Sequence, residues 1–544
     1  MNWFDDADMP RDIRAYHQRT KHAPQRYALG PAFLDWESQP DPFRRFEGAR
    51  TIRLPLDYDR PTPSFAALDA VAPEAPAPEV FDLGTLGLFL ELALGLSAWK
   101  AVDGARWPLR NNPSSGNLHP TEAYLLLPAV AGIGDGPALY HYTPVLHALE
   151  ERCTLTAGPA LPPGTFLIGL SSVHWREAWK YGERAFRYCQ HDVGHALGAM
   201  AYAAACLGWR VSVLPEPGDE TVAALLGLDR ADSCHRWEEE HPDVLAVVSP
   251  EPVIGSVALD GLTGEWHGTA NRLSEDHDPW PAVEIAAHVT TKPVCPRPAA
   301  VVSVPAPVLP TVLDLPAGAV IRRRRSAVRM DGKTGIGRDA FFRILAGTLP
   351  DPEVVPWAAF PWPARLSLLL FVHRVEGLTP GLYGLIRDPG ALERLRTACD
   401  ADFLWRAVAD CPLPFYLLRA DDVQRRASQL SCLQAIAGKG AFSLGMVADF
   451  TRTLDEDGDW AYRRLHWEAG LIGQVLYLEA GAAGLSGTGI GCFFDNEVLE
   501  TFGIDPAAMD WQTLYHFTIG GAVEDVRLQM LPAYFHLDSP MAED

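Results

Sequence analysis

The sequence predicts an α+β fold made of two tandem units that pair with each other inside one chain. Three observations predict it: an internal repeat, a proline-rich stretch near the midpoint, and two long apolar segments with helical character. The chain has 544 residues, so at least two domains of ordinary size are expected. Hydrophobic residues make up 48% of it, which is enough for a large core.

The repeat consists of two blocks that recur in the same order. A block ending at Tyr140 returns in the second half of the chain, where it ends at Tyr383. Further along the chain, three residues return at one common and larger spacing, in the pairs Arg187/Arg463, Gly194/Gly470 and Gly208/Gly484. The larger spacing places additional residues in the second copy between the blocks. Two ordered blocks indicate a duplicated unit.

Two proline-rich stretches divide the chain. The first covers residues 59–79, and the second covers residues 293–316, close to the midpoint. Prolines at this density favour extended linkers and disfavour helices and central strands. We therefore expect a first unit with an N-terminal extension at 1–290, a linker at 291–318, and a second unit at 319–544.

Apolar periodicity predicts the main elements of each unit. Residues 81–96 have helical spacing, whereas residues 124–127 and 165–170 predict short buried strands. Residues 183–207 predict one long helix that is apolar on nearly all sides in its second half, and residues 460–484 are its counterpart. A helix that is apolar all round is buried, so we expect these two helices to pack against each other.

Composition argues against several classes of protein. The net charge of −23 argues against a nucleic-acid binder and against binding to an anionic membrane surface. No apolar run approaches the ~20 residues that a membrane span needs, and residues 1–6 lack a secretory apolar region. The nine cysteines form no CxxC pair, which indicates reduced thiols and predicts a cytoplasmic protein.

The most informative stretch is the loop at residues 113–120, which reads Pro-Ser-Ser-Gly-Asn-Leu-His-Pro. Pro113 and Pro120 stiffen its ends, and Gly116 permits close approach of the backbone to a ligand. Hydrogen-bonding side chains stand at three positions: Ser114, Ser115 and Asn117. Such a loop suits the edge of a flat polar heterocycle, although a capped turn before a strand accounts for the same pattern.

This stretch closely resembles the flavin-contacting loop of the nitroreductase superfamily, and more narrowly its SagB/ThcOx-type branch, which includes the azoline oxidases. Residues 179–188 resemble the Lys-Tyr helix of that branch, and residues 35–46 resemble a signature of its long, two-unit members. The likeness runs from Tyr16 to Tyr534. It implies two nitroreductase-like units, each a mixed sheet flanked by helices, with FMN bound between them; the choice of FMN over FAD is also only implied by the resemblance.

The resemblance assigns cofactor-binding residues to both halves of the chain. The first half supplies Pro113, Ser114, Ser115, Gly116 and Asn117. The second half supplies an arginine-serine segment and a glycine segment, namely Arg323, Arg324, Arg325, Ser326, Gly489, Ile490 and Gly491, with Arg527 near the C-terminus. Guanidinium groups fork onto phosphate oxygens, so the arginines are expected to bind the phosphate. A solvated basic tether after a linker is the alternative.

The reciprocal parts are missing. Residues 361–367 of the second half contain no Ser-Ser-Gly, and residues 209–215 of the first half contain no Gly-x-Gly. We therefore expect one composite FMN site per chain and one decayed site, and two flavins per chain would contradict this.

Lys180 and Tyr181 are the predicted catalytic residues. A lysine or tyrosine with a shifted pKa can exchange a proton while flavin exchanges a hydride, and the resembled azoline oxidases use this pair in that way. The alternative is a helix start with a lysine that reaches to solvent. His191 and His195 lie four residues apart on a predicted helix, but HExxH and further ligands are missing, so no metal is expected.

The resemblance implies an FMN-dependent oxidoreductase that dehydrogenates a peptide-derived or small heterocyclic substrate, with oxygen reoxidising the flavin. One alternative is NAD(P)H-dependent reduction of nitro compounds or quinones. Another is a flavin-free scaffold that binds a peptide or a partner enzyme. The expected assembly is a monomeric pseudo-dimer or a homodimer.

Overall fold

The computed structural model describes residues 8–69, 76–230, 234–252, 257–259, 263–298, 307, 309 and 313–538. The N-terminal residues 1–6 and parts of the two proline-rich stretches, including much of the expected linker at 291–318, lie outside the described residues. Within the described ranges, no helix combines the length and the apolar character that crossing a membrane requires.

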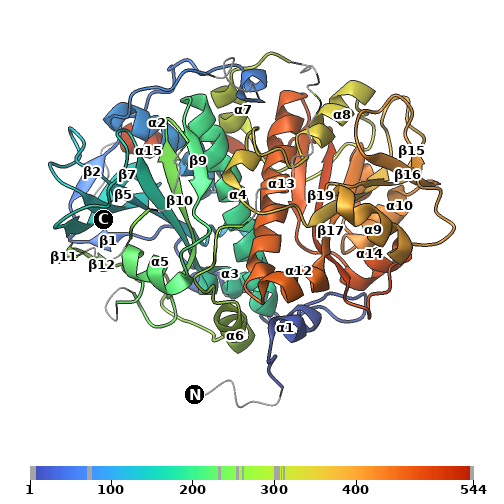
Figure 1. Cartoon of the computed structure of the whole chain (residues 1–544), viewed down its shortest axis with the longest axis horizontal. Coiled ribbons are helices and arrows are strands. Elements are labelled where there is room, and N and C mark those ends of the chain that lie inside the picture. The colour runs from blue at the N-terminus through green and yellow to red at the C-terminus, as the bar shows by residue number, and fades with distance from the viewer. Residues whose placement is uncertain are drawn as a thin grey trace.

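Two antiparallel sheets lie on either side of a central pair of long helices (Figure 1). The first sheet contains β2 (Thr51–Arg53), β5 (Thr121–Leu127), β6 (Ala138–Thr143), β7 (Ala148–Leu155), β8 (Phe166–Val173), β9 (Arg210–Val213), β10 (Glu240–Ser249) and β11 (Gly264–Trp266). The second contains β13 (Leu366–Val372), β14 (Gly381–Leu385), β15 (Arg406–Ala407), β16 (Phe415–Ala420), β17 (Phe442–Asp449), β18 (Ser486–Ile490) and β19 (Trp511–Gly520).

The two sheets share one topology. The strand order β6-β5-β8-β10-β9 of the first sheet corresponds to β14-β13-β17-β19-β18 of the second. β8 and β17 begin at the same spacing along the chain as the repeated pair Arg187 and Arg463. The predicted α+β fold of two tandem units is therefore confirmed. The described strands of each sheet pair antiparallel throughout, whereas the resemblance implied a mixed sheet.

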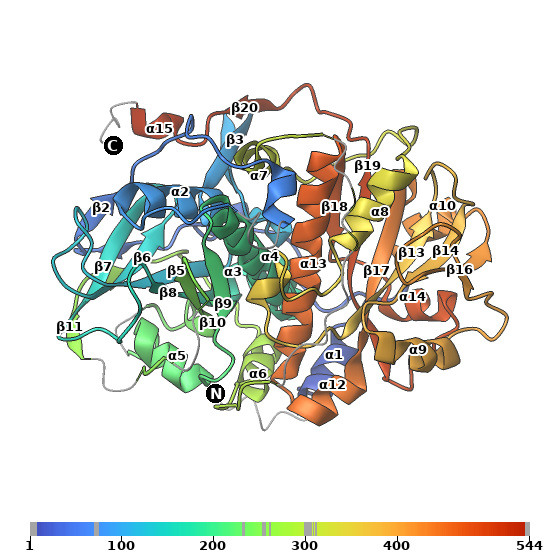
Figure 2. The same cartoon turned by 45° about the horizontal axis from the view of Figure 1, so that its top comes forward.

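Helices cover the faces and edges of these sheets (Figures 1 and 2). They are α1 (Ile13–Arg19), α2 (Leu83–Leu94), α3 (His174–Tyr181), α4 (Ala185–Cys206), α5 (Asp219–Leu226), α6 (Pro281–Val289), α7 (Ala317–Arg323), α8 (Arg338–Ala346), α9 (Leu392–Ala398), α10 (Gln424–Leu430), α11 (Ala435–Lys439), α12 (Phe450–Asp457), α13 (Ala461–Ala482), α14 (Asp495–Thr501) and α15 (Phe535–Asp538). The predicted helix at 81–96 is α2, and the predicted strands at 124–127 and 165–170 are β5 and β8.

The central helices α4 and α13 are each 22 residues long, and both ends of α13 fall at the repeat positions of the ends of α4. They cross where Gly194 meets Gly470. A Cβ atom built on Gly194 would lie 2.9 Å from the Cα of Gly470, and it would clash with the carbonyl oxygen of Trp467. A Cβ on Gly470 would clash in the same way with the carbonyl oxygen of His191. The contact is thus nearly symmetric about a pseudo-two-fold axis.

The two ends of the chain cross over to the opposite unit. On α1, the two ring nitrogens of His17 lie 3.2 Å from Tyr462 Oη and 3.2 Å from Gln512 Oε1, both in the second unit. At the other end, β20 (Gln529–Leu531) pairs with β3 (Leu96–Val102), which itself pairs with β4 (Ala105–Arg110) in the first unit. Figure 2 shows β20 beside β3 and α1 beside α12. A two-stranded sheet of β1 (Phe46–Glu47) and β12 (Thr269–Ala270) completes the first unit.

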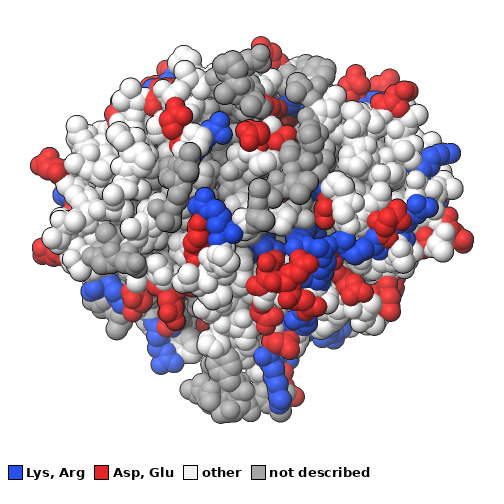
Figure 3. Space-filling model, in the orientation of Figure 1, with Lys and Arg blue, Asp and Glu red and all other residues white. Residues whose placement is uncertain are grey.

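Opposite charges alternate on the face shown in Figure 3. At the exposed surface of the protein, Arg452 lies 2.7 Å from Glu456. Paired charges of this kind add little to stability at an exposed surface. On this face, Lys and Arg side chains form a band across the middle, and acidic side chains lie beside it.

Replacing Gly470 with alanine tests the helix crossing. The new Cβ would force the two backbones apart, and overpacking of this kind costs about 1–3 kcal/mol. We expect Gly470→Ala to lower the melting temperature, measured by circular dichroism. The matched control is Gly481→Ala on the same helix, where a Cβ would meet only Val320 at 3.6 Å. There the higher helix propensity of alanine should stabilise the protein by up to about 1 kcal/mol. Equal effects of both changes would contradict the crossing.

Candidate cofactor and active site

The predicted loop at 113–117 forms a rigid turn before β5. Gly116 has a φ of 62° and Asn117 a φ of 62°, so both adopt the left-handed conformation. Asn117 Nδ2 donates to the carbonyl oxygen of Pro108 at 2.8 Å, and the backbone N–H of His119 donates to Ser114 Oγ at 2.8 Å. Its own hydrogen bonds therefore hold the loop in shape.

Lys180 and Tyr181 lie directly against this loop. They end α3, and Gly182 follows with a φ of 54°. A Cβ atom built on Gly116 would lie 2.7 Å from Tyr181 Oη and 3.1 Å from Lys180 Nζ. The structure thus brings both predicted catalytic side chains to the point where the loop backbone has no side chain.

Two buried carboxyl groups, those of Glu177 and Asp192, stand behind Lys180 and Tyr181. Asp192 Oδ1 accepts the backbone N–H of Ser115 at 3.3 Å. Burial raises the pKa of Asp192 to about 8, against the lowering effect of hydrogen bonds from Ser114 and Ser115. Burial, and then the charge of Asp192, raises the pKa of Glu177 well above its usual value. Two such carboxyls do not both ionise, so the pair holds at least one proton at neutral pH.

The second unit contributes the arginine-serine segment after α7. Buried Arg324 donates from Nε to the carbonyl oxygen of Asn111 at 2.8 Å and from Nη2 to that of Arg110 at 2.8 Å. These carbonyls immediately precede the Pro113 loop. Arg325 Nη2 donates to the carbonyl oxygen of Ser97 at 2.9 Å, and Ser326 Oγ lies 2.7 Å from Tyr477 Oη. The arginine segment of one unit is therefore bound to the loop of the other.

Arg324 and Arg325, together with Lys100 of β3, form a partly buried positive cluster without a counter-charge. In the described part of the chain, none of the three is ion-paired with a carboxylate. Burial, and then the charge of Arg324, lowers the pKa of Arg325 to about 10. Burial, then Arg325 and Arg324, also lower the pKa of Lys100. Arg324 Nη1 and Arg325 Nε lack hydrogen-bond partners. These unpaired donors fit a phosphate group.

The other predicted arginines lie differently. Arg323 is exposed, and Arg322 forms an ion pair with Glu91 at 2.8 Å instead of facing the cluster. Arg527 is 79% exposed and pairs with Asp525 at 2.6 Å. Among the described residues, no hydrogen bond or ion pair joins Arg323 or Arg527 to Arg324 and Arg325. Their role at the phosphate stays a prediction.

The glycine segment forms β18 and its exit, and aromatic side chains pack closely against it. Gly489 N–H donates to Tyr477 Oη at 2.9 Å, and a Cβ on Gly489 would clash with Tyr515. The carbonyl oxygen of Gly491 accepts from Tyr188 Oη at 3.1 Å, and Tyr188 belongs to α4 of the first unit. Ile490 between them is buried. The loop, the cationic cluster and the glycine segment therefore meet between the two units.

In the second unit, side chains occupy the position that corresponds by pseudo-symmetry to the candidate site around Asp192. Glu468 is the repeat counterpart of Asp192 and accepts the backbone N–H of Arg365 at 2.9 Å, as Asp192 does for Ser115. Fully buried Arg387, however, forms an ion pair with Glu468, and Trp362 packs 6.0 Å from the ring of Trp467. A groove of about 660 Å³ remains beside these residues. The expectation of one cofactor per chain stays a prediction, and the ion pair between Arg387 and Glu468 is the feature that favours it.

His191 and His195 pack at the unit interface. The ring of His191 stacks on Tyr515 with centroids 4.2 Å apart, and His195 Nε2 lies 3.1 Å from Tyr515 Oη. Burial lowers the pKa of both, that of His195 to about 3, so both rings are neutral.

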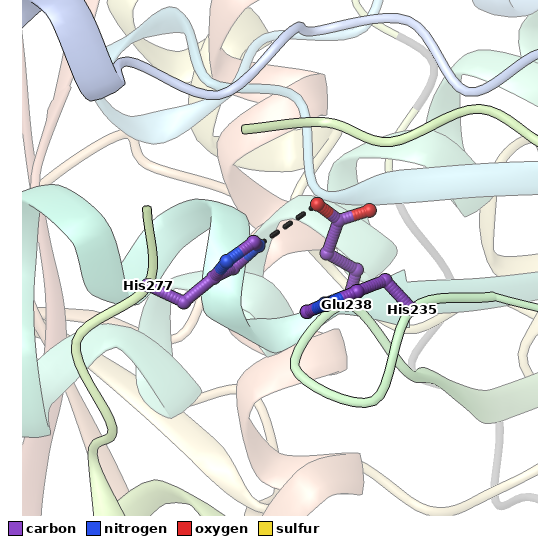
Figure 4. A group of neighbouring side chains, drawn as sticks. All are labelled: His235, Glu238 and His277. Atoms are coloured by element: carbon purple, nitrogen blue, oxygen red, sulfur yellow. Dashed lines mark hydrogen bonds and ion pairs between the residues drawn. The ribbon is translucent and has the colours of Figure 1, made fainter. Parts of the chain in front are cut away.

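Three residues of types that commonly bind metal ions lie close together elsewhere in the first unit: His235, Glu238 and His277 (Figure 4). Sequence reasoning missed it because His277 lies far along the chain. Glu238 Oε1 already accepts the backbone N–H groups of Leu273 at 2.8 Å and Ser274 at 3.1 Å, as well as His277 Nε2 at 2.8 Å. The guanidinium of Arg44 lies 3.4 Å from Glu238 Oε2 and neutralises it. These bonds indicate that the group anchors the segment at 271–278.

Sequence reasoning also missed Lys100, Glu177, Asp192 and the three tyrosines of the site, Tyr188, Tyr477 and Tyr515. Asp192 had one usable signal, because a charged side chain is seldom buried on a largely apolar helix without a role. Glu177 had none, because α3 also carries Arg176 and Lys180. The tyrosines had none, because their contacts join segments far apart in the chain.

The pKa of Asp192 predicts a pH-dependent stability. The pKa rises from 3.8 to about 8 on folding. The folded chain then binds more protons than the unfolded chain between these values, so the stability from this group is present below pH 4 and is lost as the pH rises to about 8. Asp192→Asn removes this loss. We expect its melting temperature to exceed that of the wild type increasingly from pH 5 to pH 9.

Asp331→Asn is the matched control. A hydrogen bond from Thr334, with others from the backbone, lowers the pKa of partly exposed Asp331 to about 2. The ionised Asp331 carboxylate stabilises the fold to its full extent above pH 4. Asp331→Asn should therefore shift the melting temperature by a constant amount between pH 5 and pH 9. A constant difference for Asp192→Asn as well would show that Asp192 does not titrate in this range.

Comparison with known proteins adds to this geometry. No family model matches the sequence. A candidate nitroreductase of Methanocaldococcus jannaschii is 37% identical over 148 residues, which cover 27% of this chain and 62% of that protein. The matched part is therefore less than two thirds of that relative.

A solved structure of a candidate nitroreductase from Anabaena variabilis superposes with a TM-score of 0.65 and 22% identity. The alignment covers 94% of this chain and 99% of that chain, so the two chains share their architecture over nearly their whole length. The chain thus has the nitroreductase fold in a tandem form, in which two units pair within one polypeptide.

Proposed function

We propose that the chain is an FMN-dependent oxidoreductase of the SagB/ThcOx type, with one FMN bound between the units. One observation carries the proposal. The loop at 113–117, with Lys180 and Tyr181 against it, meets a partly buried positive cluster that has no counter-charge. A flavin mononucleotide has both parts that this arrangement suits, a flat polar ring and a phosphate.

Each part of the site has a role in binding. Arg324, Arg325 and Lys100 supply cations for the phosphate, and Ser326 adds a hydroxyl. Their partly buried setting strengthens the attraction, because charges interact more strongly there than in water. The loop at 113–117 and the glycine segment at 489–491 border the ring, where missing side chains permit close approach. FMN, when bound, accepts or delivers a hydride.

The catalytic residues handle the proton. Burial, and then the charge of Glu177, raises the pKa of Tyr181 well above its usual value, so its hydroxyl keeps its proton at neutral pH. Lys180 Nζ lies 5.5 Å from the centre of the Tyr181 ring. Tyr181 and Lys180 hold and transfer the proton that the substrate gains or loses, while the Glu177–Asp192 pair behind them stores a proton out of contact with bulk water.

The favoured reaction is dehydrogenation of a peptide-derived or small heterocyclic substrate, with oxygen as the final electron acceptor. Reduction of nitro compounds or quinones by NAD(P)H is the second candidate, and the names of the two candidate nitroreductases favour it. A flavin-free scaffold is the third candidate.

The first test is cofactor content. We expect one FMN per chain after purification or reconstitution, measured from the visible spectrum of the released chromophore. Anaerobic mixing with NADPH and with an azoline-containing peptide then separates the two reactions, because only the true electron donor bleaches the flavin. A colourless protein that binds no FMN would favour the scaffold, and two FMN per chain would contradict the composite site.

Arg325→Gln tests the phosphate assignment within this experiment. Loss of a charged phosphate contact should weaken FMN binding by about 10- to 100-fold, corresponding to about 1.5–3 kcal/mol. Binding of riboflavin, which lacks the phosphate, should change little. The control is Arg106→Gln, an exposed arginine of β4. An equal loss for FMN and riboflavin would mean that Arg325 acts on the fold and not on the phosphate.

Tyr181→Phe and Lys180→Met test the catalytic assignment. Both should retain FMN and lower kcat by about 10²- to 10⁴-fold, the usual contribution of general acid–base catalysis. The pH dependence of kcat should flatten at high pH in Tyr181→Phe. Trp36→Phe is the control, since Trp36 is exposed and packs on α3 against Trp179. Unchanged kcat in both variants would remove the pair from the mechanism.

A further inference from the structure

Two cysteines, Cys432 and Cys492, meet beside the candidate site, although they belong to well-separated segments of the chain. Cys492 directly follows the glycine segment, and Cys432 lies in the turn after α10. Two hydrogen bonds join these segments: Phe494 N–H donates to the carbonyl oxygen of Leu430 at 2.8 Å, and Gln434 Nε2 donates to that of Cys492 at 3.2 Å. Both cysteines are partly exposed.

The two thiols hydrogen-bond to each other, and a histidine from the N-terminal segment completes the group. His22 hydrogen-bonds to Cys492 and Tyr27 to Cys432. His22 Nδ1 accepts the backbone N–H of Ala28 at 2.9 Å. The proton of the neutral ring therefore sits on Nε2, which is the atom left to donate to the sulfur of Cys492.

The surrounding charges favour a thiolate at Cys492. The hydrogen bond from Cys432, then that from His22, and the charge of Arg184 lower the pKa of Cys492 to about 5, against the effect of burial. The same hydrogen bond raises the pKa of Cys432 far above its usual value. Asp495 partly offsets Arg184, since their side chains lie 3.0 Å apart. At neutral pH one sulfur is thus a nucleophile and its neighbour a protonated thiol.

We propose that Cys492 and Cys432 form a redox-active dithiol that reacts with hydrogen peroxide. The Cys492 thiolate attacks one peroxide oxygen, the O–O bond breaks, and hydroxide leaves, so that Cys492 becomes a sulfenic acid. The sulfur of Cys432 then attacks the sulfur of Cys492 and displaces its hydroxyl group, which leaves as water with the thiol proton. The two sulfurs lose two electrons and form a disulfide, and the peroxide is reduced to one hydroxide and one water; the hydroxide takes up the proton that Cys492 released on ionising.

The backbone at Cys432 and the position of Cys492 both suit this role. Cys432 and Leu433 have φ values of 51° and 63°, a left-handed conformation that is unfavourable for both and that clusters at functional sites. Cys492 is covalently next to Gly491, whose carbonyl oxygen accepts from Tyr188. The Tyr188 ring lies 4.7 Å from that of Tyr181. Oxidation of the dithiol would therefore change the structure next to the predicted catalytic tyrosine.

The other partly exposed thiols provide an internal comparison. Cys295 Sγ lies 3.3 Å from the carbonyl oxygen of Pro293, and no second cysteine pairs with it among the described residues. It has comparable access to reagents without the neighbours of Cys492. The reactivity of Cys492 relative to Cys295 in one sample therefore measures the effect of its surroundings.

The test uses the reduced full-length chain without flavin or substrate. At pH 6, iodoacetamide should alkylate Cys492 at least about 10-fold faster than Cys295, because only a thiolate reacts. One equivalent of hydrogen peroxide should produce a Cys432–Cys492 disulfide, identified by peptide mass spectrometry, while Cys295 stays reduced. Equal alkylation of the two thiols, or peroxide oxidation without this disulfide, would overturn the proposal.

Two variants separate the roles of the sulfurs. Cys432→Ser should leave Cys492 as a sulfenic acid that dimedone traps, and it should slow alkylation of Cys492 at pH 6 because the strongest hydrogen bond weakens. Cys492→Ser should leave Cys432 no more reactive than Cys295. Because no cofactor is present, failure here leaves the proposed flavin chemistry untouched, and failure to bind FMN leaves this proposal untouched.

Discussion

The contact between Gly194 and Gly470 is the constraint on which the rest of the structure depends. Two helices of 22 residues can cross with their backbones touching only where neither has a side chain. That contact fixes the distance and angle between the two sheets. α4 carries Tyr188 and Asp192, and α13 carries Tyr477, so the crossing also sets how the halves of the site face each other. At this separation, Arg324 reaches the carbonyl oxygens of Arg110 and Asn111.

Duplication has produced two equivalent carboxyl groups, of which one is paired with a buried arginine and the other is not. Asp192 and Glu468 occupy the same place on their helices, and each accepts a backbone N–H from the segment before a central strand. Arg387 neutralises Glu468, and tryptophans fill the space beside it. Asp192 has no cation of this kind among the described residues, so its proton affinity rises. One added arginine therefore distinguishes the packed structural position from the one that faces the candidate site.

Much of the fold was predictable because it rests on periodic patterns. The apolar run at 183–207 and its repeat predicted the two central helices, and the repeated glycines marked the point where they meet. The loop at 113–117 was predictable from its local residues. Contacts to backbone carbonyls, such as that of Arg324 with Asn111, leave no signal in the sequence. Every residue has a carbonyl group, so the identity of the partner residue does not reveal the contact. The pairing of β20 with β3 was not predictable for a similar reason, since three residues are too few to show a period.

The uncompensated charges link cofactor binding to the pairing of the units. A chain with a net charge of −23 nevertheless keeps Arg324, Arg325 and Lys100 together in a partly buried place, where no carboxylate of the described residues forms an ion pair with them. Such a cluster is unfavourable by itself, and the lowered pKa values of its members reflect that cost. A bound phosphate would turn this repulsion into attraction. Because the arginines belong to one unit and Lys100 and the 113–117 loop to the other, a ligand that touches all of them binds only the paired arrangement and stabilises it by mass action. Joining the units in one chain keeps them at high effective concentration while the site is empty. A tandem chain can therefore keep a strained cationic site that separate subunits would hold together less readily.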